Sequence, residues 1–262
     1  MSIDRSRRVT FEETADIYNE VRPGYAENLV NDILTLAEFP TEGRILEIGC
    51  GPGNATLAFA RRGCRIVAIE LGKRLAALAR ENCRSYPKVE IINTEFENWT
   101  PEENAFDLAI AADAFHWIVP EVGYPLVARA LKSSGSVAFF WQAPVESKTD
   151  WMQAIAGEYA ARGLQADNPD TRFTVEWMKG VVCQAFQESG CFGELTIREY
   201  PSIETLTSEQ YIKNLRTYSG HQEMKADIRE NLYAGIYAAI ERFGGKVDQP
   251  RLVVLFHARV KK

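Results

Sequence analysis

The 262-residue sequence predicts a doubly wound α/β fold, in which helices cover both faces of a mostly parallel sheet. Short apolar runs alternate with helix-forming segments between residues 44 and 141. A glycine-rich turn follows the first apolar run, and an acidic residue ends the second. In open α/β sheets such features lie at the carboxyl ends of the strands, where ligands bind.

Helical segments precede the alternating region. Thr10 and Glu13 have capping-box spacing, which predicts a helix start. That helix should end before Pro23, because proline favours an extended conformation in the residue before it, Arg22. Residues 25–37 then carry apolar side chains at helical spacing.

The alternating region predicts five strands separated by helices. The expected strands cover residues 44–48, 65–69, 89–93, 106–111 and 136–141. The expected helices cover residues 54–62 and 73–83, with a further helix opened by Pro120.

The second half of the chain is less regular. Thr207 and Gln210 again have capping-box spacing, and Gly244 should stop a long helix. The expected helices cover residues 150–162, 175–189 and 223–243, and the expected strands cover residues 194–200 and 251–260. We interpret the helices between these two strands as an inserted cap.

Composition restricts the function classes. The net charge of -6 and the pI near 5.3 argue against a nucleic-acid partner. The first residues lack the apolar stretch of a secretory signal, and no segment approaches the roughly 20 apolar residues that span a bilayer. The five cysteines include no C-x-x-C pair, so we expect free thiols, no metal site and a cytoplasmic location.

The glycine-rich turn runs from Glu47 to Gly53 and reads E-x-G-x-G-x-G. Gly49, Gly51 and Gly53 allow φ angles that a Cβ forbids and let the backbone approach a ligand closely. A dinucleotide fingerprint is the rival interpretation, but Asn54 occupies the position of its third glycine.

Two acidic residues follow the turn. Glu70 ends the second strand about 20 residues later, where a carboxylate can accept hydrogen bonds from both ribose hydroxyls. Glu95 could accept a hydrogen bond from an adenine amino group while Phe96 covers the ring. Taken alone, Glu95 followed by Phe96 is more often an exposed turn acid beside a core aromatic residue.

On these motifs the chain resembles the class I S-adenosylmethionine-dependent methyltransferases over residues 10–142. The resemblance implies that the turn at Glu47 receives the methionine end of S-adenosylmethionine, that Glu70 holds the ribose, and that Glu95 and Phe96 bracket the adenine. The full expected set of cofactor-binding residues is Glu47, Gly49, Gly51, Gly53, Glu70, Leu71, Glu95, Phe96, Ala112, Tyr18 and Arg22.

Further segments are similar to a bacterial and fungal subgroup related to small-molecule methyltransferases of the trans-aconitate type. They are Tyr18, Arg22-Pro23, residues 46–53 and residues 114–117. The resemblance implies a final antiparallel hairpin and a seven-stranded sheet in the order 3-2-1-4-5-7-6. The large helical insertion departs from the family pattern, so acceptor specificity cannot be carried over.

These predictions divide the chain into five expected segments. They are an N-terminal helical lid (residues 1–40), a cofactor-binding Rossmann-like core (41–142), a continuation of the core with helices and strand six (143–204), the cap (205–248) and the final strand (249–262).

Residues after the fourth strand should face the methyl acceptor. His116 is the candidate general base, with a role in only shaping the pocket as an equal alternative. Arg22 could clamp a carboxylate or lie on the surface. His257 should be a satisfied core histidine, and His221 a loop residue. The expected substrate pocket comprises Phe115, Trp117, Trp141 and Tyr218, with cation–π attraction to the sulfonium as one use of the aromatic rings.

The leading hypothesis is an enzyme, monomeric or homodimeric, that methylates a small molecule on oxygen, nitrogen or carbon. One alternative is an NAD-dependent oxidoreductase, which Asn54 and the lack of a Tyr-x-x-x-Lys pair after the fourth strand disfavour. The other is a non-catalytic module that binds S-adenosylmethionine.

Overall fold

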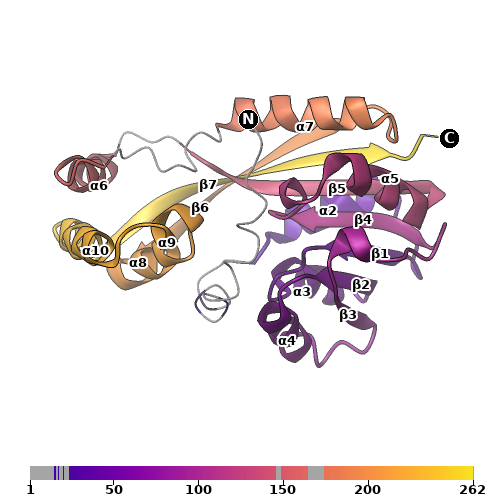
Figure 1. Ribbon diagram of the computed structural model, residues 1–262, viewed down its shortest axis with the longest axis horizontal. Coiled ribbons are helices and arrows are strands. Elements are labelled where there is room, and N and C mark those ends of the chain that lie inside the picture. The colour runs from indigo at the N-terminus through magenta and orange to yellow at the C-terminus, as the bar shows by residue number, and fades with distance from the viewer. Residues whose placement is uncertain are drawn as a thin grey trace.

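The computed structural model describes Ala15, Ile17 and Glu20 together with residues 24–145, 149–164 and 174–261. A single seven-stranded sheet organises these residues, and helices cover both of its faces (Figure 1). The strand order is β3-β2-β1-β4-β5-β7-β6, and only β7 runs antiparallel to its neighbours. The predicted fold class and strand order are therefore confirmed.

The strands follow the apolar runs closely in the first half of the chain. Their bounds are β1 Arg44–Ile48, β2 Arg65–Glu70, β3 Val89–Asn93, β4 Phe106–Ala112, β5 Leu131–Pro144, β6 Thr196–Thr207 and β7 Lys246–Arg259. The last three strands are longer than expected, because β5, β6 and β7 continue to pair past the edge of the parallel sheet.

Two apolar layers hold the helices to the sheet. On one face α2 (Glu27–Leu36) and α3 (Asn54–Ala60) pack through side chains such as Ile33 and Phe59. On the other face α5 (Pro120–Ala130) and α7 (Val175–Ser189) pack around Phe139 and Phe186. The helix α4 (Lys73–Asn82) covers β2 and β3.

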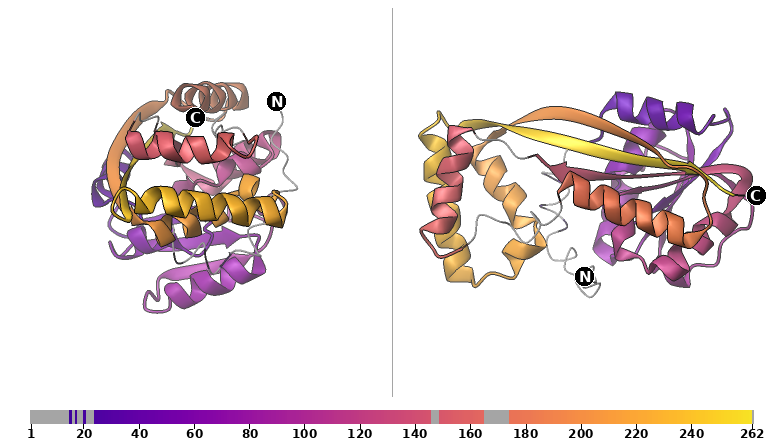
Figure 2. Two further views of the ribbon diagram at one scale, coloured as in Figure 1. Left: turned by 90° about the vertical axis from the view of Figure 1, so that its left-hand side faces the viewer. Right: turned by 90° about the horizontal axis from the view of Figure 1, so that it is seen from above.

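The β6–β7 hairpin extends beyond the carboxyl end of β5. That strand ends at Pro144, which pairs with Arg251, whereas β6 and β7 continue for five further pairs from Ile203↔Pro250 to Thr207↔Lys246. At about 3.4 Å per residue this extension spans about 17 Å. It carries α8 (Ser208–Arg216), α9 (Ser219–Gln222) and α10 (Ala226–Glu241) away from the sheet (Figures 1 and 2).

We define the cap as α6 (Asp150–Ala160), α8, α9 and α10, because these helices share a separate apolar cluster. Leu232, Ile236 and Ile240 of α10 are fully buried in it. The expected division assigned α6 to the continuation of the core, but α6 packs against α10 instead. Two separate segments of the chain therefore form the cap, and α7, which lies between them in the sequence, packs on the core (Figure 2).

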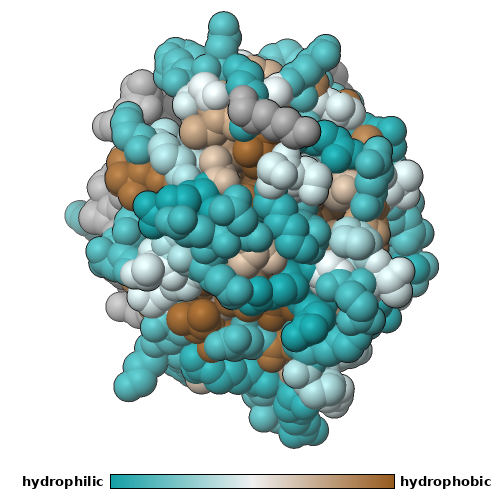
Figure 3. Space-filling model, turned by 90° about the vertical axis from the view of Figure 1, so that its right-hand side faces the viewer, coloured by the Kyte–Doolittle hydropathy of each residue, from teal (hydrophilic) through white to brown (hydrophobic). Residues whose placement is uncertain are grey.

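The opposite face of the molecule, away from the cap, is mostly hydrophilic with small apolar patches between the polar side chains (Figure 3).

The predicted capping box at the start of α8 is present, because the Thr207 hydroxyl accepts from the Gln210 backbone and the Gln210 side chain accepts from the Thr207 backbone. The other predicted box, at Thr10 and Glu13, lies outside the described residues.

Candidate functional site

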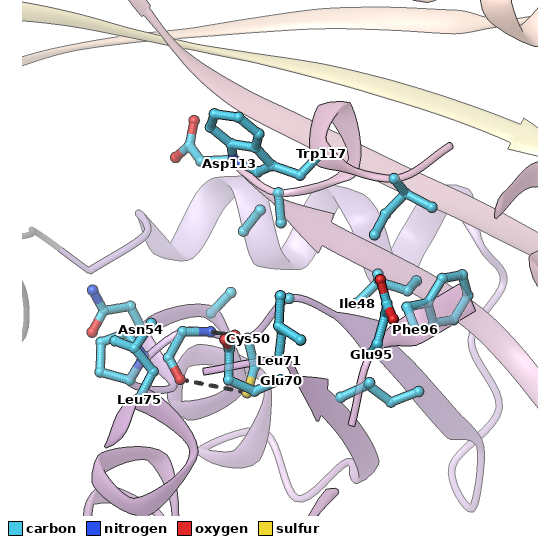
Figure 4. A pocket seen from close by; sticks show the side chains of 18 of the residues that line it. Ile48, Cys50, Asn54, Glu70, Leu71, Leu75, Glu95, Phe96, Asp113 and Trp117 are labelled. Atoms are coloured by element: carbon cyan, nitrogen blue, oxygen red, sulfur yellow. Dashed lines mark hydrogen bonds between the residues drawn. The ribbon is translucent and has the colours of Figure 1, made fainter. Parts of the chain in front are cut away.

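A cavity lies at the carboxyl ends of β1, β2 and β4 (Figure 4), at the edge of the sheet towards which the cap lies (Figure 2). Of the predicted site residues, it brings together Gly49, Gly51, Glu70, Leu71, Glu95, Phe96, Ala112 and Trp117. The cavity is also lined by residues that were not among the predicted site residues: Tyr25, Asn54, Thr94, Glu97, Asp113 and Gln142.

The glycine turn forms one wall of this cavity. Gly49, Gly51 and Gly53 have φ angles of 68°, 56° and 94°, which L-residues with a Cβ rarely adopt. A Cβ on Gly49 would lie 2.6 Å from the Ala114 Cβ, whereas one on Gly51 would meet nothing within 4 Å. The turn therefore needs glycine at residue 49 for space and at all three positions for conformation.

Glu47 lies beneath the turn and does not line the cavity. Its side chain is fully buried, and one carboxyl oxygen accepts a hydrogen bond of 2.7 Å from the Thr56 hydroxyl. Burial raises the pKa of Glu47 to about 7. This residue supports the start of α3 from below, and its predicted contact with the cofactor stays a prediction.

Glu70 connects the two backbone turns that flank the cavity. One of its carboxylate oxygens accepts from the Gly51 N–H at 2.8 Å, and the other accepts from the Gly72 N–H at 2.7 Å. These bonds orient the carboxylate between the glycine turn and the start of α4. Its predicted contact with ribose hydroxyls stays a prediction.

The loop after β3 forms the far end of the cavity. Glu95 and Phe96 lie there together (Figure 4). Glu95 accepts a hydrogen bond from the Asn98 amide, and Phe96 is only 3% exposed and stacks on Trp99. A carboxylate and an apolar surface are thus placed where an adenine ring is expected.

The segment after β4 supplies an additional carboxylate. Asp113 has a φ of 54°, and its two oxygens accept from the Gln142 backbone N–H at 2.7 Å and from the Tyr25 hydroxyl at 2.9 Å. All three residues line the cavity. A polar residue directly after a strand of a parallel sheet is a signal that could have identified Asp113 from the sequence.

His116 precedes the lining residue Trp117 but does not itself line the cavity. Its Nδ1 accepts a hydrogen bond of 3.0 Å from the Trp141 indole N–H, which places the proton of the neutral ring on Nε2. Burial lowers the pKa of His116 to about 4. Neither His116 nor Trp141 is among the residues that line the cavity.

Phe115 and Tyr218, two further predicted pocket residues, lie elsewhere. Phe115 is 4% exposed and stacks on Phe139 in the core, with ring centroids 4.1 Å apart. Tyr218 packs at the margin of the cap cluster and does not line the cavity. Gly53 also lies outside the lining, next to Ala79 and Cys83. Tyr18 and Arg22 lie outside the described residues.

The remaining histidines are buried. His221 was expected in a loop, but it lies in α9, where its Nε2 is 3.0 Å from the Tyr159 hydroxyl and its ring stacks on Tyr233. His257 is a core residue as predicted, but its Nε2 has no hydrogen-bond partner among the described residues, so it is not fully satisfied. Burial lowers the pKa of both rings to about 4.

Comparison with known families identifies the class of enzyme. The family model described as "Methyltransferase domain" matches residues 45–135, which include the glycine turn, Glu70, Glu95 and Asp113. The chain is a class I S-adenosylmethionine-dependent methyltransferase. Its cofactor is accordingly S-adenosylmethionine.

Two curated relatives of this methyltransferase extend beyond the matched domain. An uncharacterized methyltransferase of Mycobacterium tuberculosis is 24% identical over 82% of this chain and 88% of its own length. A trans-aconitate 2-methyltransferase of Escherichia coli is 28% identical over 75% of each chain. The predicted resemblance to the methyltransferase class is therefore confirmed.

A solved structure shares the fold of the methyltransferase. Phosphoethanolamine N-methyltransferase 2 of Haemonchus contortus, in complex with phosphomonomethylethanolamine and S-adenosylhomocysteine, superposes with a TM-score of 0.56 at 15% identity. The match covers 99% of this chain and 60% of the other.

None of the helices in the described part of the chain combines the length and the hydrophobicity of a membrane span.

Proposed function

We propose that this methyltransferase transfers its methyl group to a small-molecule acceptor that binds between the cofactor cavity and the cap. The observation that carries the proposal is the extension of the β6–β7 hairpin past the same strand ends that line the cavity. The hairpin brings the cap over that edge of the sheet (Figure 2). A site that lies opposite a cap suits a compact acceptor better than a polymer.

The residues of the cavity fit S-adenosylmethionine. The space beside Gly51 is open, so a ligand can approach the backbone there. Glu70 and Glu95 offer carboxylate oxygens to hydroxyl and amino groups, and Ile48, Leu71 and Leu75 offer apolar surface. Glu70 would hold the ribose, and Glu95 with Phe96 would hold the adenine.

When bound, S-adenosylmethionine supplies a methyl group on a sulfonium, and a nucleophile can attack the methyl carbon in line with the sulfur that leaves. The protein then has to align the acceptor and exclude water. Cap residues would exclude water, and the segment after β4 would align the acceptor. Because Nδ1 of the neutral His116 ring accepts from Trp141, Nε2 carries the ring proton, and the ring does not line the cavity, we assign His116 the role of orienting Trp141.

The identity of the relatives leaves the acceptor open. The name trans-aconitate belongs to the Escherichia coli enzyme, and the family model matches residues 45–135, within the cofactor domain. The cap of the present chain, which faces the acceptor side, is held by its own apolar cluster. Acceptor class is therefore a question for the residues of this chain.

A screen for transfer of labelled methyl groups tests the proposal. The full-length protein and labelled S-adenosylmethionine are incubated with a metabolite library and, separately, with fractions of protein and nucleic acid. Label is expected in one or a few small molecules. Label that enters only a macromolecular fraction would contradict the proposal.

A further inference from the structure

Glu47 is a buried acid in the centre of the sheet. It lies on β1 opposite Ala68 of β2 and Ile110 of β4, and its side chain has 0% exposure. Both neighbours belong to the apolar layer that α2 and α3 cover. A charged carboxylate is unfavourable in such surroundings unless a cation or several hydrogen bonds compensate for its burial.

The described residues compensate Glu47 only in part. Its Oε2 accepts from the Thr56 hydroxyl, whereas its Oε1 is buried and has no hydrogen-bond partner among them. Within the described chain, the charged side chain that acts on Glu47 is Glu70, and no cation offsets this like charge. The thiols of Cys50 and Cys83 also lie near it, and burial raises the pKa of each, so both stay neutral.

Glu47 can therefore change its charge near neutral pH. Its pKa of about 7 follows from burial and from the like charge of Glu70. Thr56 can donate to Oε2 in either state, so Oε1 is the oxygen that gains and loses the proton. A new positive charge nearby would favour the ionised form, because it would supply the cation that the surroundings lack.

The cofactor cavity begins two residues after Glu47. Gly49, Cys50 and Gly51 line it, so the turn separates the carboxyl from a bound ligand. S-adenosylmethionine carries an ammonium, a carboxylate and a sulfonium group and is a cation overall, whereas S-adenosylhomocysteine lacks the sulfonium charge and is neutral overall. Charges interact strongly where protein excludes water, so Glu47 can respond to this difference without touching the ligand.

We propose that Glu47 is the residue through which this methyltransferase distinguishes its cofactor from the demethylated product. Glu47 loses its proton to solvent when the cationic S-adenosylmethionine binds, and it regains the proton once the sulfonium charge is gone. The enzyme then prefers its cofactor over its product most strongly in mildly alkaline solution. The inference rests on the proposed placement of the cofactor beside the glycine turn, and it does not depend on the class of acceptor.

Calorimetric titrations with the two ligands at pH 5.5 and pH 8 test the inference. The quantity to compare is the Kd for S-adenosylhomocysteine divided by the Kd for S-adenosylmethionine, in which the titration of groups shared by both ligands largely cancels. The three histidines, with pKa values lowered to about 4, stay neutral in this range. We expect the ratio to rise about tenfold, the effect of a pKa change of about one unit in Glu47.

Variants of Glu47 assign the effect. Glu47→Gln keeps the shape and removes the charge, so the ratio should stay at the low wild-type value at both pH values. Glu47→Asp keeps an ionisable carboxyl and should retain a rise. Glu90→Gln is the matched control, because Glu90 is exposed on β3, and it should behave as the wild type. Urea unfolding checks that each variant is folded.

Proton release gives a second measurement, which needs no variant. Titrations at pH 7 in buffers of different ionisation enthalpy should show that S-adenosylmethionine releases a larger fraction of a proton than S-adenosylhomocysteine does. Equal release by both ligands, a wild-type ratio that does not change with pH, or a folded Glu47→Gln variant with the wild-type rise would overturn the inference. A Gly49→Ala variant with wild-type affinity for both ligands would instead contradict the placement of the cofactor beside the turn.

Discussion

The cofactor cavity and the cap are shaped in different ways. In the cofactor cavity, glycine conformations and hydrogen bonds from the Gly51 and Gly72 backbone to Glu70 shape a wall. In the cap, packing of Leu232, Ile236 and their neighbours positions the helices, and the polar groups of Tyr159 and His221 are enclosed. The comparison indicates that cofactor binding depends on backbone geometry, whereas the cap depends on side-chain packing.

The largest expected effect comes from the cap core. Leu232→Ala removes a side chain with 0% exposure from the cluster, and truncations of this kind cost about 2–5 kcal/mol of unfolding free energy. Urea unfolding should show this loss, while calorimetry should show an S-adenosylhomocysteine Kd close to that of the wild type. A large loss of cofactor affinity in the folded variant would mean that the two regions are not separable.

Gly49→Ala should affect the cofactor domain strongly. The alanine would have to adopt a φ of 68°, and its Cβ would lie 2.6 Å from the Ala114 Cβ. We expect S-adenosylhomocysteine affinity to fall about a hundredfold, equivalent to about 2.7 kcal/mol. Gly163→Ala is the matched control, because Gly163 has a φ of 65° but open space around it. Equal effects of both changes on affinity would attribute the loss to backbone conformation in general.

Acid should destabilise the cap through His221. Its pKa falls from an ordinary 6.5 to about 4 in the folded protein, because burial disfavours the charged ring. The unfolded chain therefore binds more protons below pH 6.5, so the stabilising contribution is complete above pH 6.5 and is lost as the pH falls towards 4. At pH 5 the loss is about 2 kcal/mol, from roughly 1.4 kcal/mol per pKa unit.

Urea unfolding at pH 7.5 and at pH 5 measures this dependence. The His221→Gln variant should lose less stability than the wild type between the two pH values, although it is less stable at pH 7.5. His116 and His257 also have pKa values lowered to about 4, so part of the slope should remain. A variant with the full wild-type slope would show that His221 does not titrate as its burial implies.

The smallest expected effect is that of Glu70→Ala. The change removes a carboxylate that accepts from the Gly51 and Gly72 N–H groups and that we assign to the ribose. Hydrogen bonds to charged groups contribute about 1.5–3 kcal/mol, so S-adenosylhomocysteine affinity should fall at least tenfold with the fold intact. Glu90→Gln, on the exposed side of β3, should leave the affinity unchanged. An unaltered Kd in Glu70→Ala would contradict the assignment.

The sequence predicted the strands and the turn around the cavity because their signals are local. A strand, a glycine turn and an acid at the end of the next strand are fixed by spacing along the chain, and parallel pairing then brings them to one edge. The positions of Glu70 and Phe96 in the cavity follow from this regularity.

The acceptor side could not be predicted in the same way because its contacts are between distant segments. Tyr25 reaches Asp113 across 88 residues, and the spacing of a helix says nothing about that bond. Tyr218 was predicted as a pocket residue, but it packs against the cap cluster, whose members come from α6, α8 and α10 and are far apart in the sequence. Likewise α6 has ordinary helical periodicity, which does not reveal that its partner is a helix far along the chain.

The twofold passage of the chain through the cap restricts how this enzyme can be recombined with its relatives. A chimera that exchanged only residues 208–241 would leave α6 facing a foreign α10, with Trp151, Ile155 and Tyr159 set against side chains that did not evolve beside them. A functional transplant must carry α6 and the α8–α10 segment together, while α7 stays with the core that it covers. The cap of this protein is therefore a single packing unit that is built from two separated segments.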